Sequence, residues 1–352
     1  MSEFFDTLFD FDDLLIEPAV LSKISSRKQV NPRTIWGTLP IMTAPMDTVI
    51  NENNFHLFKE NGIVPVLPRT GEKRGDLSLY DTQVFMSYSI EEFKQIFLQS
   101  NRIYPPSGER IMALIDVANG HMTSLYEVAK EAKMKYGYDL CLMVGNVANP
   151  RTFLEYCKIG VDMVRIGIGN GNGCLTTVQT GVGYPMASLI EECNDIRKVT
   201  EYRTQIIADG GFKKFSDVIK ALGLGADYVM LGSILNKALE SAGETTNNDG
   251  EIINQYHPDT KKMFHVELPL YKTFRGMSTK EVQKSWGKDD LTTSEGVIRR
   301  NKVEYTLEGW VKNFEDYLRS AMSYTGKKEL HHFIGGVEFN LITMNSFKRF
   351  DK

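Results

Sequence analysis

Eight short apolar segments recur along the chain, and many of them end at glycine, proline, aspartate or asparagine. They are rich in β-branched or aromatic residues, which is typical of strands in a parallel sheet that is covered on both faces. Most of the gaps between them carry amphipathic stretches, so strand and helix alternate as in a (β/α)8 barrel, the TIM-barrel architecture. A doubly wound open sheet is the alternative, but no GxGxxG segment opens a helix after the first strand. The predicted strands are residues 39–45, 62–68, 82–88, 110–117, 140–146, 162–169, 205–211 and 227–233.

The amphipathic segments predict the outer layer of helices. No solenoid-period repeat, low-complexity tract or evident linker divides the chain. We therefore expect a single α/β domain over residues 1–352, with an N-terminal extension and a C-terminal helix and tail. The predicted helices are residues 51–62, 89–100, 122–137, 148–160, 215–225 and 306–326.

Composition narrows the setting of the protein. The 352 residues are 42% hydrophobic, which is enough for a large core, and the net charge is −4 without a dense Lys/Arg block. This argues against a nucleic-acid partner. No apolar run approaches the roughly 20 residues of a membrane helix, and the acidic N-terminus does not have the pattern of a signal peptide. The four cysteines form no CxxC pair. We expect a soluble, reduced, cytoplasmic protein with no membrane partner.

A glycine-rich stretch after the sixth predicted strand, residues 167–185, carries Cys174. Alternating glycines let the backbone adopt positive φ and approach a ligand or an ion closely. A partly exposed thiol among backbone dipoles has the kind of surroundings that lower a cysteine pKa and favour the nucleophilic thiolate. An incidental cysteine in a flexible loop is the alternative. The other cysteines, Cys141, Cys157 and Cys193, fall in a predicted strand or in helices and are expected to be buried and inert.

A barrel places its chemistry at the carboxyl ends of its strands. Polar and glycine residues gather at these ends, although a single glycine after a strand often only terminates it. The turns after the seventh and eighth strands lie where such barrels commonly bind phosphate through backbone N–H groups. These two turns are Asp209-Gly210-Gly211 and Gly232-Ser233.

Taken together, the motifs resemble those of the IMP dehydrogenase/GMP reductase family along nearly the whole chain. Several ordered motifs at compatible spacing are more specific than any one alone. The matching segments are FDFDDLLIEP, APMDTV, DVANGH, VGNV, the Cys174 loop, IIADGG, YVMLGS, FRGMS and SEG.

Within this family the sequence is more similar to the reductase branch. The segment CLTTVQTGVGYP resembles the reductase pattern, only a short polar segment separates FRGMS from TSEG where dehydrogenases carry a long flap, and there is no inserted CBS module after VPVLP. In contrast, the segment APMDTV is closer to the sequence found in dehydrogenases. The resemblance implies NADPH-dependent reductive deamination of GMP to IMP and ammonia. An NAD-dependent IMP dehydrogenase that forms XMP, or a non-catalytic purine-nucleotide-binding barrel, is the alternative.

The resemblance also implies catalytic and substrate-binding residues. Cys174 would attack C2 of the guanine ring and form a thioimidate, and Thr176, relayed by Glu295, would protonate the departing amino group. The alternatives are that Thr176 is a helix cap and that Glu295 is a solvated surface carboxylate. The residues implied in nucleotide binding are Met46, Asn172, Asp209, Gly210, Gly211, Gly232, Ser233, Gly276, Met277, Ser278, Ser294 and Gly296.

By the same resemblance a cofactor, an ion and an assembly are expected. NADPH would contact Arg69, Asp116, Val117, Ala118, Gly167 and Ile168, and a potassium ion would bind at Gly169, Gly171, Cys174 and Thr177, mainly through backbone carbonyls. The family also leads us to expect a homotetramer. Four positions depart from the family pattern, namely Asn172 for serine, Thr177 for a basic residue, Arg69 for lysine and Thr292 for arginine, and residues 244–274 form a longer segment that we expect to project from the barrel.

Overall fold

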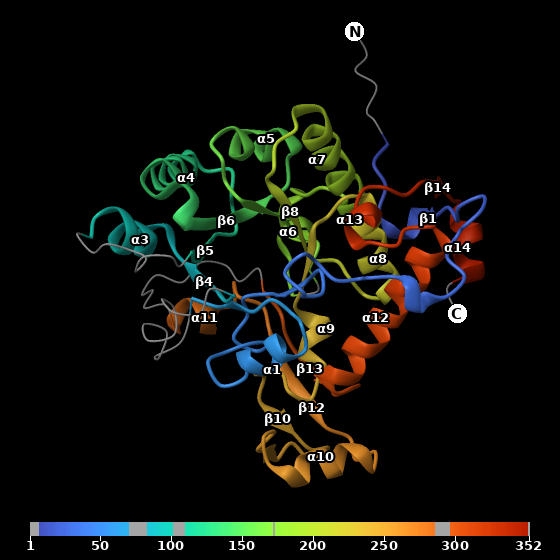
Figure 1. The fold of residues 1–352 in the computed structure, drawn as a ribbon. Helices are drawn as coiled ribbons and strands as arrows, with labels where there is room; N and C mark the ends of the chain where they lie inside the picture. Colours follow the sequence, from blue (N-terminus) through green and yellow to red (C-terminus); the bar gives the residue numbers. More distant parts are fainter. Residues whose placement is uncertain (1–6, 70–82, 101–109, 172, 286–295, 351–352) are drawn as a thin grey trace.

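The computed structural model describes residues 7–69, 83–100, 110–171, 173–285 and 296–350 (Figure 1). Its centre is an eight-stranded parallel sheet in the order β2-β9-β8-β7-β6-β5-β4-β3. The sheet closes between its two ends, because Val64 N donates to Ile41 O at 3.0 Å and Thr43 N donates to Val64 O at 3.1 Å. This confirms the predicted barrel and its strands. The barrel strands are β2 (Ile41–Thr43), β3 (Val66–Leu67), β4 (Phe85–Tyr88), β5 (Ile111–Asp116), β6 (Leu140–Val147), β7 (Met163–Ile166), β8 (Gln205–Asp209) and β9 (Tyr228–Leu231).

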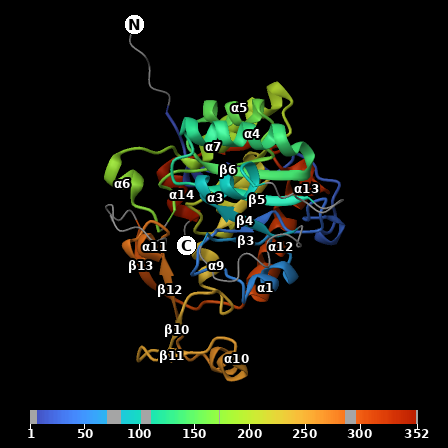
Figure 2. The same ribbon diagram turned by 90° about the vertical axis from the view of Figure 1, so that its left-hand side faces the viewer.

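Helices cover the outside of this sheet, and Figure 2 shows several of them above the barrel strands. Each predicted amphipathic segment forms a helix. Two helices, the short α6 (Thr176–Thr180) and the longer α7 (Met186–Thr200), lie in a gap for which no helix was predicted. The helices around the barrel are α1 (Phe55–Glu60), α3 (Ile90–Phe93, continued by a π-helical turn at Lys94–Leu98), α4 (Thr123–Tyr136), α5 (Pro150–Lys158), α6 (Thr176–Thr180), α7, α8 (Phe215–Leu224), α9 (Ser233–Asn236), α11 (Lys280–Ser285) and α12 (Leu307–Tyr324).

The side chains of α12 show why this segment folds against the barrel. Leu307, Trp310, Val311, Phe314 and Leu318 are all buried and follow the helical spacing of three or four residues. The side chain of Thr306 caps the first turn by accepting from Gly309 N at 3.2 Å. The apolar stripe therefore faces the barrel, and α12 completes the outer layer as predicted.

The two ends of the described chain pack together beside α8. Strand β1 (Leu14–Ile16) pairs antiparallel with β14 (Phe339–Leu341), and α13 (Leu330–Phe333) and α14 (Met344–Phe350) lie near this pair. Short 3-10 turns at Phe11–Asp13 and Arg27–Gln29 complete the N-terminal part, and another lies at Gly137–Asp139.

A small second sheet projects from the barrel, at the bottom of Figure 1. We call it the lobe (residues 244–275 and 296–303). Its four antiparallel strands are ordered β11-β10-β12-β13. The buried Lys272 on β12 donates to Gln255 Oε1 within the lobe at 2.9 Å and to Ser241 O, just before the lobe, at 2.8 Å. The predicted projecting segment thus supplies most of the lobe. Its elements are β10 (Thr245–Thr246), β11 (Ile252–Ile253), α10 (Pro258–His265), β12 (Tyr271–Arg275) and β13 (Ile298–Lys302).

The barrel has two core clusters, as expected for a closed sheet. Met42, Phe85, Leu114 and Met230 belong to the cluster that fills the barrel, and a larger cluster lies between the strands and the helices. The cysteines outside the glycine-rich loop are buried, as predicted, and burial raises the pKa of the Cys141 thiol to about 12. Among the helices of the described ranges, none combines the length and hydropathy needed to cross a bilayer.

Candidate active site

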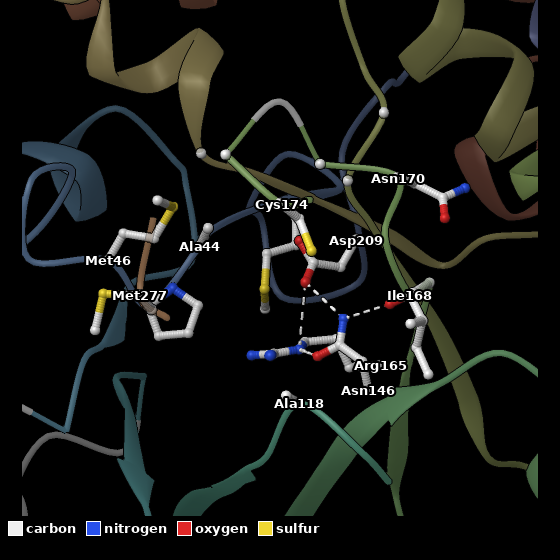
Figure 3. A pocket seen from close by; sticks show the side chains of 18 of the residues that line it. Ala44, Met46, Ala118, Asn146, Arg165, Ile168, Asn170, Cys174, Asp209 and Met277 are labelled. Atoms are coloured by element: carbon white, nitrogen blue, oxygen red, sulfur yellow. Dashed lines mark hydrogen bonds and ion pairs between the residues drawn. The ribbon is translucent and has the colours of Figure 1, made fainter. Parts of the chain in front are cut away.

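A cavity of about 530 Å³ opens at the carboxyl ends of the barrel strands, a volume suited to a small-molecule ligand. The loops after β2, β5, β7, β8 and β9 form most of its wall, as the barrel rule predicts. The lobe completes the wall through Phe274 at the end of β12, followed by Met277 and Ser278. Figure 3 shows Met46 and Met277 on one side of the cavity and Ile168 and Asn170 on the other.

Cys174 is half-buried and lines the cavity, and Figure 3 shows its sulfur pointing into this space. Its Sγ lies 3.2 Å from Thr176 Oγ1. A turn places the thiol there, since Cys174 N donates to Gly171 O at 2.9 Å. Thr176 is the first helical residue of α6, and Leu175 holds the N-cap position, so Thr176 is not the N-cap. The Cys174 thiol and the Thr176 hydroxyl can therefore exchange a proton with a molecule bound at the mouth of the barrel.

Gly169 is a position where the loop requires glycine. Its φ is +79°, and a Cβ built there would lie 1.7 Å from Thr177 Oγ1. That hydroxyl is held in the loop by donating to Val182 O at 2.7 Å, and Thr177 does not line the cavity. The loop therefore folds tightly over Gly169, and this close packing shapes the backbone that leads to Cys174.

We predict that Gly169→Ala disrupts the cysteine loop, whereas Gly181→Ala costs only backbone strain. Gly181 has a similar φ of +73°, but nothing lies within 4 Å of an added Cβ. Gly181→Ala should lower the free energy of unfolding by about 1 kcal/mol, and Gly169→Ala by clearly more. Urea unfolding and the alkylation rate of Cys174 measure both effects. Equal losses in the two variants would show that the contact with Thr177 does not constrain the loop.

A buried network of charges forms the floor of the cavity (Figure 3). Arg165 on β7 donates from Nη2 to Asp116 Oδ1 at 2.7 Å, and its Nε lies 3.4 Å from Asp209 Oδ2. Asn146 on β6 donates from Nδ2 to Asp209 Oδ2 at 2.8 Å, and its Oδ1 accepts from Arg165 Nε. Burial raises the pKa of Asp209, while Arg165 and Asn146 oppose the rise. Among the described residues, Nη1 of Arg165 is buried and has no hydrogen-bond partner.

The sequence analysis assigned no role to Arg165 or Asn146. A single arginine between apolar residues in the segment 163–166 was the available signal, because a buried charge needs a partner. The partners themselves come from β5, β6 and β8, which lie on both sides of β7 in the sheet. Arg69 follows β3 and approaches the same network, with its Nε 3.5 Å from Asp116 Oδ2. Two of the residues predicted to bind the cofactor, Arg69 and Asp116, are thus neighbours.

Most of the predicted site residues line one cavity. Gly276 and Gly296 lie behind the wall, where Gly276 N donates to Val297 O at 2.9 Å, so their contact with a substrate stays a prediction. Asn172, Thr292, Ser294 and Glu295 lie outside the described residues. The predicted residues that line the cavity are Met46, Arg69, Asp116, Val117, Ala118, Gly167, Ile168, Gly169, Gly171, Cys174, Thr176, Asp209, Gly210, Gly211, Gly232, Ser233, Met277 and Ser278.

Comparison with known proteins agrees with this geometry. The model of the IMP dehydrogenase / GMP reductase domain matches residues 109–349. The chain belongs to this family. Among its relatives are the GMP reductase of Buchnera aphidicola, 30% identical over 97% of this chain and 98% of the relative, and GMP reductase 2 of Mus musculus, 28% identical over 96% and 95%. GMP reductase 2 of Homo sapiens is 30% identical over 96% and 95%. The family resemblance seen in the sequence is therefore confirmed.

Proposed function

We propose that this protein is a GMP reductase, which converts GMP to IMP and ammonia with NADPH. The observation that carries the proposal is the Cys174 sulfur, which points into the barrel mouth 3.2 Å from the Thr176 hydroxyl. The named relatives support it, because they match nearly the whole chain and are GMP reductases. A soft nucleophile beside a hydroxyl suits displacement of an amino group from a purine carbon, because the thiolate can add to the carbon and the hydroxyl can pass a proton to the leaving group.

In the proposed reaction the Cys174 thiolate adds to C2 of the guanine ring. Ammonia leaves with a proton delivered through Thr176, because an unprotonated amide ion is a very poor leaving group. The purine is then held as a thioimidate, with sulfur bonded to C2. NADPH, when bound, supplies the hydride that replaces sulfur at C2. GMP, NADPH and two protons thus yield IMP, NADP⁺ and an ammonium ion, and Cys174 returns as a thiolate.

The residues present fit the two nucleotides. Glycine backbone at Gly210, Gly211 and Gly232, together with Ser233, offers N–H and hydroxyl donors for the phosphate of GMP. Asp116, Val117 and Ala118 line the cavity at the end of β5 and are the residues that we expect beside the reduced cofactor. Arg69 beside Asp116 adds a cation at that end. We expect NADPH to lie there.

The ion and the assembly are further parts of the proposal. The carbonyl oxygens of Gly169 and Gly171 are ligands of the kind that a monovalent cation binds. Gly171 O also accepts a hydrogen bond from Cys174 N. The side chain of Thr177 is bonded within the loop, so only its carbonyl could serve, and that carbonyl accepts from Gly181 N at 2.9 Å. Potassium, a homotetramer and a cytoplasmic location stay predictions.

Absorbance at 340 nm, read together with released ammonia, tests the proposed reaction. We expect a mixture of the protein, GMP and NADPH to lose absorbance in step with ammonia release. A gain of absorbance only with IMP and NAD⁺ would reject the proposal in favour of a dehydrogenase. No turnover in either mixture, combined with GMP protection of Cys174 from alkylation, would indicate a nucleotide-binding barrel without catalysis.

A further inference from the structure

Asn236, the last residue of α9, does not line the cavity, and the proposed reaction does not use it. It is fully buried, where an unpaired amide would be destabilising. Its Nδ2 donates to Thr48 O at 2.8 Å and to Thr273 O at 3.0 Å. Its Oδ1 accepts from Asn301 Nδ2 at 2.9 Å. Because both N–H groups face carbonyl oxygens and the oxygen faces a donor, the amide is held in one orientation.

Two of these partners are near neighbours, along the chain, of residues that line the cavity. Thr48 is two residues beyond Met46 in the loop after β2, and Thr273 immediately precedes Phe274 at the end of β12. The loop and the strand are also bonded to each other, since Arg275 on β12 forms an ion pair with Asp47. Asn236 therefore joins the barrel wall to the wall that the lobe supplies.

The third partner leads to the cysteine loop. Asn301 lies on β13, and the residues just before this strand pair with the loop. Gly296 forms an antiparallel bridge with Cys174, and Val297 N donates to Gly173 O at 3.2 Å. Displacing β13 would therefore move the backbone that carries the sulfur.

The same helix also reaches the cavity at its other end. Helix α9 begins at Ser233, which lines the cavity, and its single turn is closed by Asn236 N donating to Gly232 O at 2.9 Å. Ser241 Oγ donates to Asn236 O at 2.8 Å and holds the end of the helix. The single turn of α9 thus connects Ser233, which is proposed to bind the phosphate, to Asn236, whose hydrogen bonds lead to the cysteine loop.

We propose that Asn236 is a positioning residue, which holds the Cys174 sulfur in register with a nucleotide bound at Gly232 and Ser233. This inference rests on the proposed function. It places Asn236 behind the reacting groups, where it acts through the cysteine loop and the end of β12. Since a misplacement of about 1 Å can slow a reaction about 100-fold, a single amide at this junction can matter for turnover without touching the substrate.

The test compares Asn236→Ala with Asn194→Ala. Asn194 on α7 is also buried, at 3% exposure, and donates to Leu224 O at 3.0 Å, but it does not line the cavity. We expect Asn236→Ala to lower kcat for GMP reduction about 10- to 100-fold, with a change in KM for GMP of less than about threefold. Asn194→Ala should keep kcat within about twofold of the wild type. Wild-type kcat in Asn236→Ala, or an equal loss of kcat in Asn194→Ala, would overturn the positioning role.

A second variant and a second readout cover the remaining outcomes. Asn301→Ala keeps both Nδ2 bonds of Asn236 and removes only the connection to β13, so it decides the matter if Asn236→Ala does not fold. Iodoacetamide labelling of Cys174, followed by peptide mass spectrometry, needs no turnover. We expect labelling at least about threefold faster in Asn236→Ala and Asn301→Ala than in Asn194→Ala, because the loop is freer to open. If the wild type fails to reduce GMP, the proposed function is wrong, and equal labelling rates in these variants then overturn the positioning role separately.

Discussion

Replacing Cys174 with alanine is expected to abolish GMP reduction, with a fall in kcat of at least about 10⁴-fold. The sulfur is the nucleophile in the proposed reaction, and alanine leaves no atom that can bond to C2. Binding of GMP should stay within about an order of magnitude, because the glycine backbone and Ser233 that would hold the phosphate are untouched. Absorbance at 340 nm with released ammonia measures turnover, and calorimetry measures GMP binding.

Cys193→Ala is the matched control for this variant. Cys193 is a fully buried thiol on α7 and lies outside the cavity, so its loss should reduce stability and leave turnover intact. Mass spectrometry of wild-type protein trapped with GMP should show a nucleotide adduct on Cys174 and none on Cys193. Substantial turnover by Cys174→Ala would rule out the covalent intermediate.

Replacing Arg165 with methionine should have the second-largest effect. The guanidinium lies between Asp116 and Asp209 and is 9% exposed. Its removal takes the cation away from Asp209 and leaves Asp116 with Arg69 at 3.5 Å, and breaking such a buried pair costs about 3–5 kcal/mol of unfolding free energy. Turnover should also fall, since the cavity floor loses the group that orients both carboxylates. Urea unfolding and steady-state kinetics measure the two losses.

The stability loss in Arg165→Met should depend on pH. Burial already raises the pKa of Asp209 in the folded protein, and Arg165 opposes that rise, so the variant raises this pKa further. Between the unfolded and folded pKa values the folded state binds more protons, and stability therefore falls as pH rises through that window. The window starts near the ordinary aspartate value and extends upward. We expect a smaller stability loss at pH 5 than at pH 7, and equal losses would contradict the assignment to Asp209.

Arg197→Met separates catalysis from stability in this experiment. Arg197 on α7 pairs with Asp227, whose pKa burial also raises, but neither residue lines the cavity. This variant should lose stability with a similar pH trend and keep its turnover. A comparable loss of turnover in Arg197→Met would mean that the effect of Arg165→Met on activity is a consequence of lower stability alone.

The predicted strands agree with the structure because each is a local pattern of buried residues. Helix α7 was missed for a related reason. Its first five residues, Met186 to Ile190, are all buried, so the contrast between an apolar and a polar face is weak there. Helix α12, with one buried stripe and a Thr306 cap, was predicted. Amphipathicity predicts a helix best where only one face is covered.

The candidate site shows the same division between local and distant information. Cys174 stood out because the glycines and the thiol lie within one short segment, and its family context is carried by ordered motifs. Arg165 did not stand out, and Asn146 was noted only as part of the VGNV segment without a role, since their partners lie on other strands. Asn236 carried no signal, because nothing near it in the chain requires an amide. Its side chain bonds to the carbonyl oxygens of Thr48 and Thr273 and to the side chain of Asn301. These partners belong to the barrel and to the lobe.

By itself the sequence determined the eight-stranded barrel, the edge of the sheet where chemistry would lie, and the thiol that would carry it, because period, turn residues and motif order are properties of neighbouring positions. The tertiary structure alone decided that Arg165 joins Asp116 to Asp209, and that Asn236 joins α9 to the walls around Cys174. The physical reason is that a buried polar group needs partners in three dimensions, and strand register and lobe packing choose those partners.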